Sequence, residues 1–344
     1  MLSICFNTLV NGYTVQEDPE QMISHSKRRR IAPNMPWGGA LIILLLILSA
    51  WINQSFIHSS PPKRIASTTP SKASFPYMVT PGPLNTPSLP FKIGESSGIL
   101  WNLNTHQLLW KLHPHQPGPL ASTTKLMTFY LIWHHLALNQ VVRVGPQAAA
   151  TTGSDIYMAV GEHYTVHQLL YALMLASANN AAVALAEKMS GTRAQFVAAM
   201  NRQARQFGMN GTHYADPDGL SPKSTGTAWD LSIIVQQDLR IPLFRKIVDT
   251  RVASLPHNPV VRNLNSLLFL DPSVTGVKTG WTTQAGFNLV FTATRNVNGR
   301  PVTLLGVILH GQHGFPPENQ DAEKILQWGF HRLRVNQTHF NPGV

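Results

Sequence analysis

The stretch that decides the fold reads Ala121-Ser122-Thr123-Thr124-Lys125-Leu126-Met127-Thr128. Pro119 precedes Ser122 and apolar residues follow it at helical spacing, a pattern typical of a helix N-terminus. Residues three apart lie on one face of a helix, so Ser122 and Lys125 are expected within hydrogen-bond distance of each other. A serine hydroxyl becomes nucleophilic when a nearby base takes its proton, and a lysine is such a base only when neutral.

The spacing Ser-x-x-Lys is a weak signal by itself, because it also occurs at Ser24–Lys27 and Ser60–Lys63. Neither of those pairs has an apolar helical run after it. An isolated instance is most simply an N-cap serine beside a solvated lysine. Two further motifs reverse this interpretation for Ser122, since Ser177-Ala178-Asn179 and Lys278-Thr279-Gly280 follow it in this order.

Lys278 brings a second positive charge, which helps to lower the pKa of Lys125 if the strand that carries it lies beside the helix. The free backbone N–H groups at a helix N-terminus are suited to stabilise a developing oxyanion. The three motifs therefore predict one acyl-transfer site. Such a set is typical of serine enzymes that recognise penicillin.

With the motifs in place, the chain resembles the low-molecular-mass penicillin-binding proteins, specifically serine D-alanyl-D-alanine carboxypeptidases of the S11 peptidase family. The similarity also includes the segments 161–173, 201–220 and 275–282, and it covers roughly residues 95–334. It implies an α+β fold of the β-lactamase/D,D-peptidase type. In that fold an antiparallel sheet is flanked by helices, a mainly helical region lies beside it, and the active site lies between them.

The resemblance also implies roles for eight residues. Ser122 would be the acylated nucleophile, Lys125 its general base and Ser177 a proton relay towards the leaving amine. The amide of Asn179 would bind the substrate backbone, and Lys278 and Thr279 would bind its terminal carboxylate. Gly280 would also belong to the substrate-binding site. The backbone N–H groups of Ser122 and Trp281 would form the oxyanion hole.

Three residues depart from the family's usual pattern. Ala178 stands where glycine is usual, and its methyl group is expected to narrow the cleft or to change the turn. Asn180 replaces a frequent acidic residue, and Trp281 stands where His or Tyr is common. These differences bear on substrate preference more than on the chemistry.

The activity implied by the resemblance is removal of the terminal D-alanine from peptidoglycan stem pentapeptides through an acyl-enzyme on Ser122. β-Lactams would be covalent inhibitors. A D,D-endopeptidase that cleaves peptidoglycan cross-links on the same residues is the alternative. A β-lactamase is less favoured because no acidic residue is recognisable for fast deacylation, and the intact motifs argue against an inactive wall-binding scaffold.

Composition limits the other classes of function. The 344 residues carry a net charge of +11, but no pattern of aromatic and basic residues and no zinc-finger spacing indicates a nucleic-acid partner. The 15 histidines include His113 with His115 and His163 with His167, yet no H-E-x-x-H motif occurs, so no metal and no cofactor are expected. The single cysteine, Cys5, excludes a disulfide framework.

Four boundaries divide the chain. Residues 1–36 are expected to form a cytoplasmic tail, and 37–56 a transmembrane signal anchor, or alternatively a signal peptide, because Lys27 to Arg30 precede an apolar stretch. Residues 57–92 form a Pro/Ser/Thr-rich linker, 93–335 the D,D-peptidase catalytic domain and 336–344 a C-terminal tail. We therefore expect a bacterial inner-membrane protein whose catalytic domain is periplasmic.

Periodicity predicts the main elements of the catalytic domain. Residues 97–112 read as a hairpin, and Asn298-Gly299 as the turn of a second hairpin that includes a half-buried strand at Phe287–Phe291. Thr165 and Gln168 predict a capping box before a helical run, and residues 192–207 a helix that Gly208 ends. The run after Gln168 is interrupted near residues 176–179 and resumes at Ala181, so a loop between two helices is expected to present Ser177 and Asn179 to the cleft. Residues 321–333 are expected to form a helix packed on the core. Helices grouped between early and late strands imply one sheet made from both ends of the domain.

Overall fold

The computed structural model describes residues 86–338. The predicted tail (1–36), anchor (37–56) and all but the last residues of the linker (57–92) lie outside the described residues, as do residues 339–344. Within residues 86–338, no helix has both the length and the apolar character needed to cross a membrane.

The described residues form strands, helices and one 3₁₀ turn, η1. They are β1 (Ser97–Asn102), β2 (Gln107–Leu112), β3 (Gly118–Pro119), η1 (Ala121–Thr124), α2 (Lys125–His135), β4 (Val141–Arg143), α3 (Pro146–Ala149), β5 (His163–Thr165), α4 (Val166–Leu175), α5 (Asn179–Ser190), α6 (Arg193–Gln206), β6 (Thr225–Gly226), α7 (Ala228–Asp238), α8 (Pro242–Asp249), β7 (Val252–Leu255), β8 (Asn258–Arg262), α9 (Leu267–Leu270), β9 (Val274–Thr282), β10 (Gly286–Val297), β11 (Arg300–Gly311) and α10 (Phe315–Thr338).

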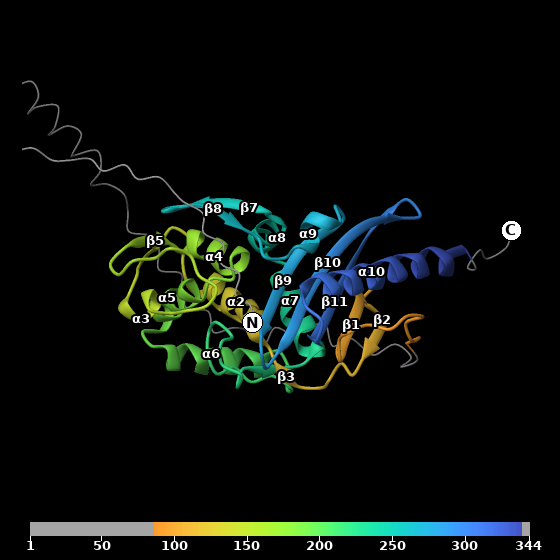
Figure 1. Cartoon of the computed structure of the whole chain (residues 1–344), viewed down its shortest axis with the longest axis horizontal. Coiled ribbons are helices and arrows are strands. Elements are labelled where there is room, and N and C mark those ends of the chain that lie inside the picture. The colour runs from red at the N-terminus through yellow and green to blue at the C-terminus, as the bar shows by residue number, and fades with distance from the viewer. Residues whose placement is uncertain (1–85, 339–344) are drawn as a thin grey trace, which may run out of the picture. The chain divides into compact units, whose positions relative to one another are not determined.

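One antiparallel sheet of five strands, in the order β2-β1-β11-β10-β9, is built from both ends of the described domain. Both predicted hairpins are confirmed as β1–β2 and β10–β11, and Asn298 and Gly299 have the positive φ values, 51° and 82°, of a tight hairpin turn. Figure 1 shows the sheet beside a mainly helical region that contains α2 to α6. The predicted fold class is confirmed.

Both faces of the sheet are buried. Ile99 and Trp101 point into a core shared with the helical region, whereas Leu100 points into a second core beneath α10. Figure 1 shows α10 along one face of the sheet and α7 on the other. The strand predicted at Phe287–Phe291 is confirmed within β10, but it is not half-buried, because Leu289 packs towards α10 while Val290 packs towards the helices.

Helix α4 begins and helix α6 ends at the capping residues that the sequence predicts. The capping box is present: Thr165 Oγ1 accepts from the Gln168 N–H at 3.2 Å, and Gln168 Oε1 accepts from the Thr165 N–H at 2.8 Å. Helix α6 ends at Gln206, and Gly208 follows with a φ of 71°. These caps begin α4 and end α6, the helices on either side of α5.

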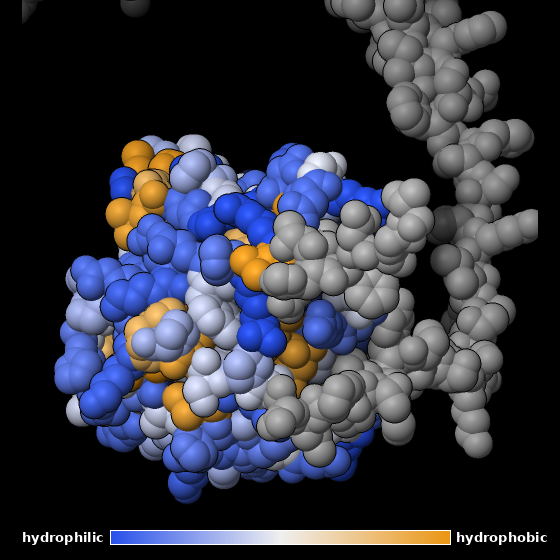
Figure 2. Space-filling view, turned by 90° about the vertical axis from the view of Figure 1, so that its right-hand side faces the viewer, coloured by the Kyte–Doolittle hydropathy of each residue, from blue (hydrophilic) through white to orange (hydrophobic). Residues whose placement is uncertain are grey.

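The last helix packs on the sheet, as predicted. Ile325, Leu326 and Phe330 are fully or almost fully buried in the core beneath α10. The helix continues to Thr338, past the predicted domain end at residue 335. Figure 2, which views this end of the molecule, shows a mostly hydrophilic surface on which apolar areas are separate rather than continuous.

Candidate active site

The nucleophile candidate lies where the chain enters the first long helix. Ser122 is in the 3₁₀ turn η1, and Lys125 is the first residue of α2. Side chains three apart are eclipsed in a 3₁₀ turn. Lys125 Nζ accordingly lies 3.0 Å from Ser122 Oγ, which is the proximity that the spacing predicts.

Three contacts surround the Lys125 amine. Besides Ser122 Oγ, Nζ lies 2.7 Å from Asn179 Oδ1 and 2.5 Å from the Asp218 carbonyl oxygen. A neutral amine has two N–H donors and one lone pair, and the amide and carbonyl oxygens can only accept. They therefore take the two N–H groups, and the lone pair is left facing the Ser122 hydroxyl.

Burial shifts the Lys125 amine towards that neutral form. Lys125 is completely buried, and burial lowers its pKa from 10.5 to about 8, while the neighbouring Asp218 and Asp216 raise it in part. The cost of burying the ammonium group therefore outweighs two nearby carboxyl groups. A lysine with this pKa is an effective general base near neutral pH.

Ser177 and Ala178 of the second motif lie in the loop between α4 and α5, as predicted, and Asn179 is the first residue of α5. Ser177 has a φ of 57°, a left-handed conformation that is uncommon for a serine and that turns the chain sharply at the site. Ala178 has an ordinary φ of −60°, and its methyl group is fully buried in the helical core. The methyl group therefore faces away from the cleft, contrary to the expectation that it narrows it.

Asn179 is held on both sides of its amide. Its Oδ1 accepts from Lys125, and its Nδ2 donates to the Thr152 carbonyl at 2.9 Å. Its backbone N–H also donates to the Ser154 carbonyl at 2.7 Å. The structure thus gives Asn179 a part in orienting the base, a contact that the sequence did not predict.

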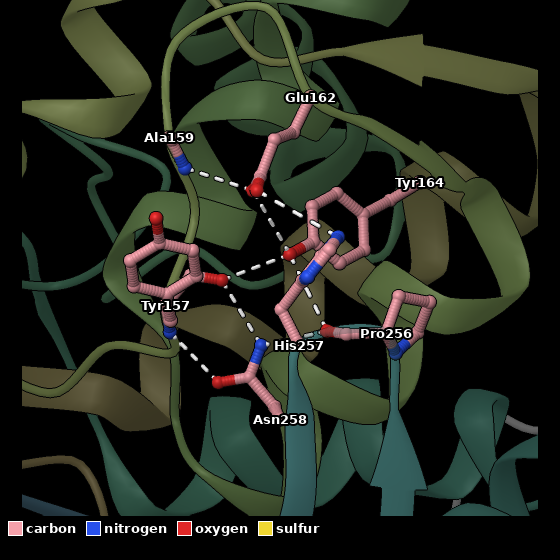
Figure 3. A network of polar contacts seen from close by, with 7 residues as sticks. All are labelled: Tyr157, Ala159, Glu162, Tyr164, Pro256, His257 and Asn258. Atoms are coloured by element: carbon pink, nitrogen blue, oxygen red, sulfur yellow. Dashed lines mark hydrogen bonds and ion pairs between the residues drawn. The ribbon is translucent and has the colours of Figure 1, made fainter. Parts of the chain in front are cut away.

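A polar network anchors the segment that contacts Asn179 (Figure 3). Asn258, at the start of β8, accepts from the Tyr157 N–H at 2.8 Å and donates to the Tyr157 carbonyl at 3.0 Å. Tyr164 donates its hydroxyl to the same carbonyl at 2.8 Å, and Glu162 accepts from the Ala159 N–H at 2.9 Å. Burial and Glu162 raise the pKa of Tyr164 to about 12, so this hydroxyl remains a donor.

The third motif lies on β9, the edge strand of the sheet. Lys278 Nζ lies 3.0 Å from Ser177 Oγ and 2.8 Å from the Thr279 carbonyl oxygen. Lys278 is almost fully buried, and burial together with the charge of Lys125 lowers its pKa well below the usual 10.5. The motifs on η1–α2, on the α4–α5 loop and on β9 therefore meet in one place between the sheet and the helical region.

Gly280 lets β9 approach the nucleophile turn. A Cβ at this position would lie 3.1 Å from the backbone nitrogens of Ser122 and Thr123, tighter than side chains normally pack. The next residue, Trp281, is 52 % exposed, and its ring lies 6.0 Å from that of Phe287. The backbone of β9 thus reaches the turn while the indole remains open to solvent.

Asp218 belongs to the site although its sequence context favours a turn or cap residue, as for Asp155 and Asp216, over a catalytic acid. Its side chain forms the expected turn by accepting from the Leu220 N–H at 3.1 Å, but its carbonyl also holds the Lys125 amine. Burial and the adjacent Asp216 raise the pKa of the Asp218 carboxyl to about 6. The signal available was the pair of acidic residues around Pro217, directly before Gly219.

Gly219 fixes this turn against the nucleophile segment. Its φ is 83°, and a Cβ there would overlap the carbonyl group of Ala121. We expect Gly219→Ala to lower the free energy of unfolding by about 3 kcal/mol or more in urea denaturation. Gly208→Ala is the matched control, because Gly208 has a φ of 71° with free space around it, and it should cost only about 1 kcal/mol. Equal losses would contradict the close contact with Ala121.

The remaining candidates lie apart from these motifs. His115 packs against Trp229 at 4.9 Å between ring centroids, and His167 against Tyr171 at 5.1 Å. Among the residues that the structure describes, no group of three or more side chains of the metal-binding types is arranged to hold an ion.

Comparison with known proteins supports the same grouping. The sequence profile of the Peptidase S11 family, described as D-alanyl-D-alanine carboxypeptidase, matches residues 84–311. The D-alanyl-D-alanine carboxypeptidase DacF of Bacillus subtilis is 30 % identical over 70 % of this chain, a match that spans 63 % of the relative, less than two thirds of its length.

Two further comparisons agree. The D-alanyl-D-alanine endopeptidase of Escherichia coli is 30 % identical over 69 % of this chain and 77 % of that protein. The crystal structure of penicillin-binding protein 5 from Haemophilus influenzae superposes with a TM-score of 0.66 at 30 % identity, covering 71 % of this chain and 73 % of that one. With its sheet order, its three assembled motifs and these matches, the chain belongs to the S11 family of D-alanyl-D-alanine carboxypeptidases.

Proposed function

We propose that this protein is a serine D-Ala-D-Ala carboxypeptidase that removes the terminal D-alanine from peptidoglycan stem pentapeptides and binds penicillin covalently. The observation that carries the proposal is the set of three contacts at the Lys125 amine, which leaves its lone pair facing Ser122 Oγ. That geometry pairs a nucleophile with a base whose pKa is lowered to about 8.

The reaction would proceed in two halves. Lys125 takes the proton of Ser122 while Oγ attacks the carbonyl of the penultimate D-alanine, and the C–N bond then breaks. The proton passes to the leaving amine through Ser177, whose Oγ contacts Lys278 at 3.0 Å. Water, activated by the same base, then hydrolyses the ester and restores Ser122.

Substrate binding would use the edge of the sheet. An extended peptide can pair with the free edge of β9, and the terminal carboxylate would lie near Lys278 and Thr279. Burial and the charge of Lys125 lower the pKa of Lys278, and an arriving carboxylate would raise it again by favouring the ammonium form. The backbone N–H groups of Ser122 and Trp281 would bind the oxyanion.

The second candidate function is cleavage of D,D-cross-links between stem peptides. It is supported by the similarity to the E. coli endopeptidase, 77 % of whose length the match covers. The two activities share the acyl-enzyme and differ in the leaving group. Assays of cross-linked dimers beside monomeric pentapeptides separate them.

The proposed location is the bacterial inner membrane, with residues 37–56 as anchor and the catalytic domain in the periplasm. It rests on the basic residues before the apolar stretch in the sequence. The mass of the mature protein isolated from membranes would distinguish a retained anchor from a cleaved signal peptide.

Treatment of the full chain with penicillin is expected to add the mass of one penicillin molecule, as measured on the intact protein. The same preparation should release D-alanine from a stem pentapeptide. Rapid turnover of penicillin instead of a stable adduct would favour a β-lactamase. An absence of both adduct and turnover of any D,D-peptide would contradict the proposal and favour a wall-binding scaffold.

A further inference from the structure

A strained residue lies directly before the nucleophile. Ala121 has a φ of 47°, in the left-handed region that non-glycine residues rarely adopt, and it is almost fully buried. Such a conformation persists only where surrounding contacts determine it. The orientation of the Ser122 hydroxyl and N–H group depends on this turn, so the contacts that hold it bear on catalysis.

One buried side chain supplies those contacts from the sheet. Asn288 on β10 is completely buried, and its Nδ2 donates to the carbonyl oxygens of Pro119 and Leu120, at 3.1 Å each. These are the two carbonyls that precede Ala121. A single amide therefore fixes the segment that enters the strained turn.

A β-bulge orients that amide. The pairing of β10 with β11 passes from Phe287–Gly311 to Leu289–Ile308, so two residues of β11 lie opposite Asn288 alone. One of them, His310, has a φ of 64°, and its N–H donates to Asn288 Oδ1 at 2.8 Å. The bulge thus occupies the acceptor of the Asn288 amide and leaves its NH₂ group for the nucleophile segment.

The register places this contact beside the third motif. Asn288 pairs with Gly280 across β9 and β10. Gly280 has no side chain, and this lets the Ser122 backbone nitrogen pack directly against it. The paired residues Gly280 and Asn288 therefore both contact the backbone of residues 119–123. The glycine permits close approach, and the asparagine supplies the hydrogen bonds that hold the segment down.

We propose that Asn288 is a positioning residue that holds the segment from Pro119 to Thr123 in its strained conformation, so that the hydroxyl and N–H of Ser122 point at one reacting carbonyl. Nothing in the sequence motifs assigns this role. The proposal rests on the proposed acyl-transfer function, because it concerns the rate at which Ser122 is acylated.

The test is the second-order rate of acylation by a fluorescent penicillin, measured per folded molecule on the full chain. Asn288→Leu removes the donors at nearly constant volume and should slow acylation about 100-fold, since small displacements of a reacting group have effects of that size. Asn288→Asp, which keeps the acceptor for the His310 N–H, should also slow it and provides the measurement if the leucine variant does not fold.

Asn263 offers a matched control. It is 4 % exposed, its Nδ2 donates to the carbonyls of Val248 and Thr250 at 3.2 and 3.0 Å, and its Oδ1 accepts from the Asn265 N–H at 2.9 Å. Asn263→Leu therefore loses an equivalent set of bonds away from the nucleophile turn. Its acylation rate per folded molecule should change less than about 3-fold.

A second substitution separates positioning from general stability. Glycine adopts the left-handed conformation without strain. The double variant Ala121→Gly/Asn288→Leu should therefore be acylated about 10-fold faster than Asn288→Leu alone. Ala121→Gly should give no such increase with Asn263→Leu. Equal losses in the two leucine variants, or a loss that Ala121→Gly leaves unchanged, would overturn the role of Asn288. A wild-type protein that is not acylated at all would overturn the proposed function, and the inference with it.

Discussion

Replacing Ser122 by alanine is expected to abolish the penicillin adduct and to lower D-alanine release by at least about 10⁴-fold. Within residues 86–338, the hydroxyl that contacts the Lys125 amine is that of Ser122, whereas Ser177 Oγ is paired with Lys278. The variant should fold normally, since Ser122 contributes one small hydroxyl at a partly exposed position. Intact-mass measurement after penicillin treatment reads the result directly.

Ser232→Ala is the matched control for this prediction. Ser232 is a buried helical serine on α7 whose hydroxyl donates to the Trp229 carbonyl at 2.7 Å, and it lies outside the three motifs. Its adduct should form as in the wild type. An adduct that persists in Ser122→Ala would assign the nucleophile to a different residue, and peptide mapping would locate it.

The sequence predicted the assembly of the site well because its motifs act through short-range geometry. The three-residue spacing of Ser122 and Lys125 brought their side chains to 3.0 Å, and the break between two helical runs placed Ser177 on a loop. The hairpins were also predictable, since Asn298-Gly299 favours a tight turn. Each of these features depends on a few consecutive residues.

Features that depend on distant parts of the chain were not predictable. The half-buried strand expected at Phe287–Phe291 proved to be covered on both faces, because α10 returns over the sheet from the end of the domain. The methyl group of Ala178 was expected to narrow the cleft or to change the turn, and the first alternative is wrong because the methyl group packs in the helical core. Periodicity reports that one face of a strand is apolar, and it does not report what covers the other.

The residues that position Ser122 and Lys125 were not predictable for the same reason. The Asp218 carbonyl lies 93 residues from Lys125 along the chain, and Asn288 lies 168 residues from Leu120. Backbone carbonyls and a single buried asparagine leave no pattern in the sequence. The residues that do the chemistry were therefore easier to predict than the residues that hold them in place.

Lys125→Met is expected to slow acylation by about 10³-fold, because methionine fills a similar volume but has no lone pair able to accept the proton of Ser122. The acylation rate should be measured at pH 8 with a labelled penicillin. Lys188→Met is the matched control, since Lys188 is exposed on α5 and makes no contact with the motifs. Its rate should equal that of the wild type.

The pH profile tests the same base in the unmodified protein. Lys125 must be neutral to act, and burial sets its pKa at about 8, so acylation should rise with pH below 8 and level off above it. The neutral fraction is about 1 % at pH 6 and about 50 % at pH 8, which predicts a rise of about 50-fold between them. The residual activity of Lys125→Met should lack this rise. A wild-type rate that stays flat from pH 6 to 8 would mean that another group takes the proton of Ser122, and that the contacts of the Lys125 amine serve only to hold the loops together.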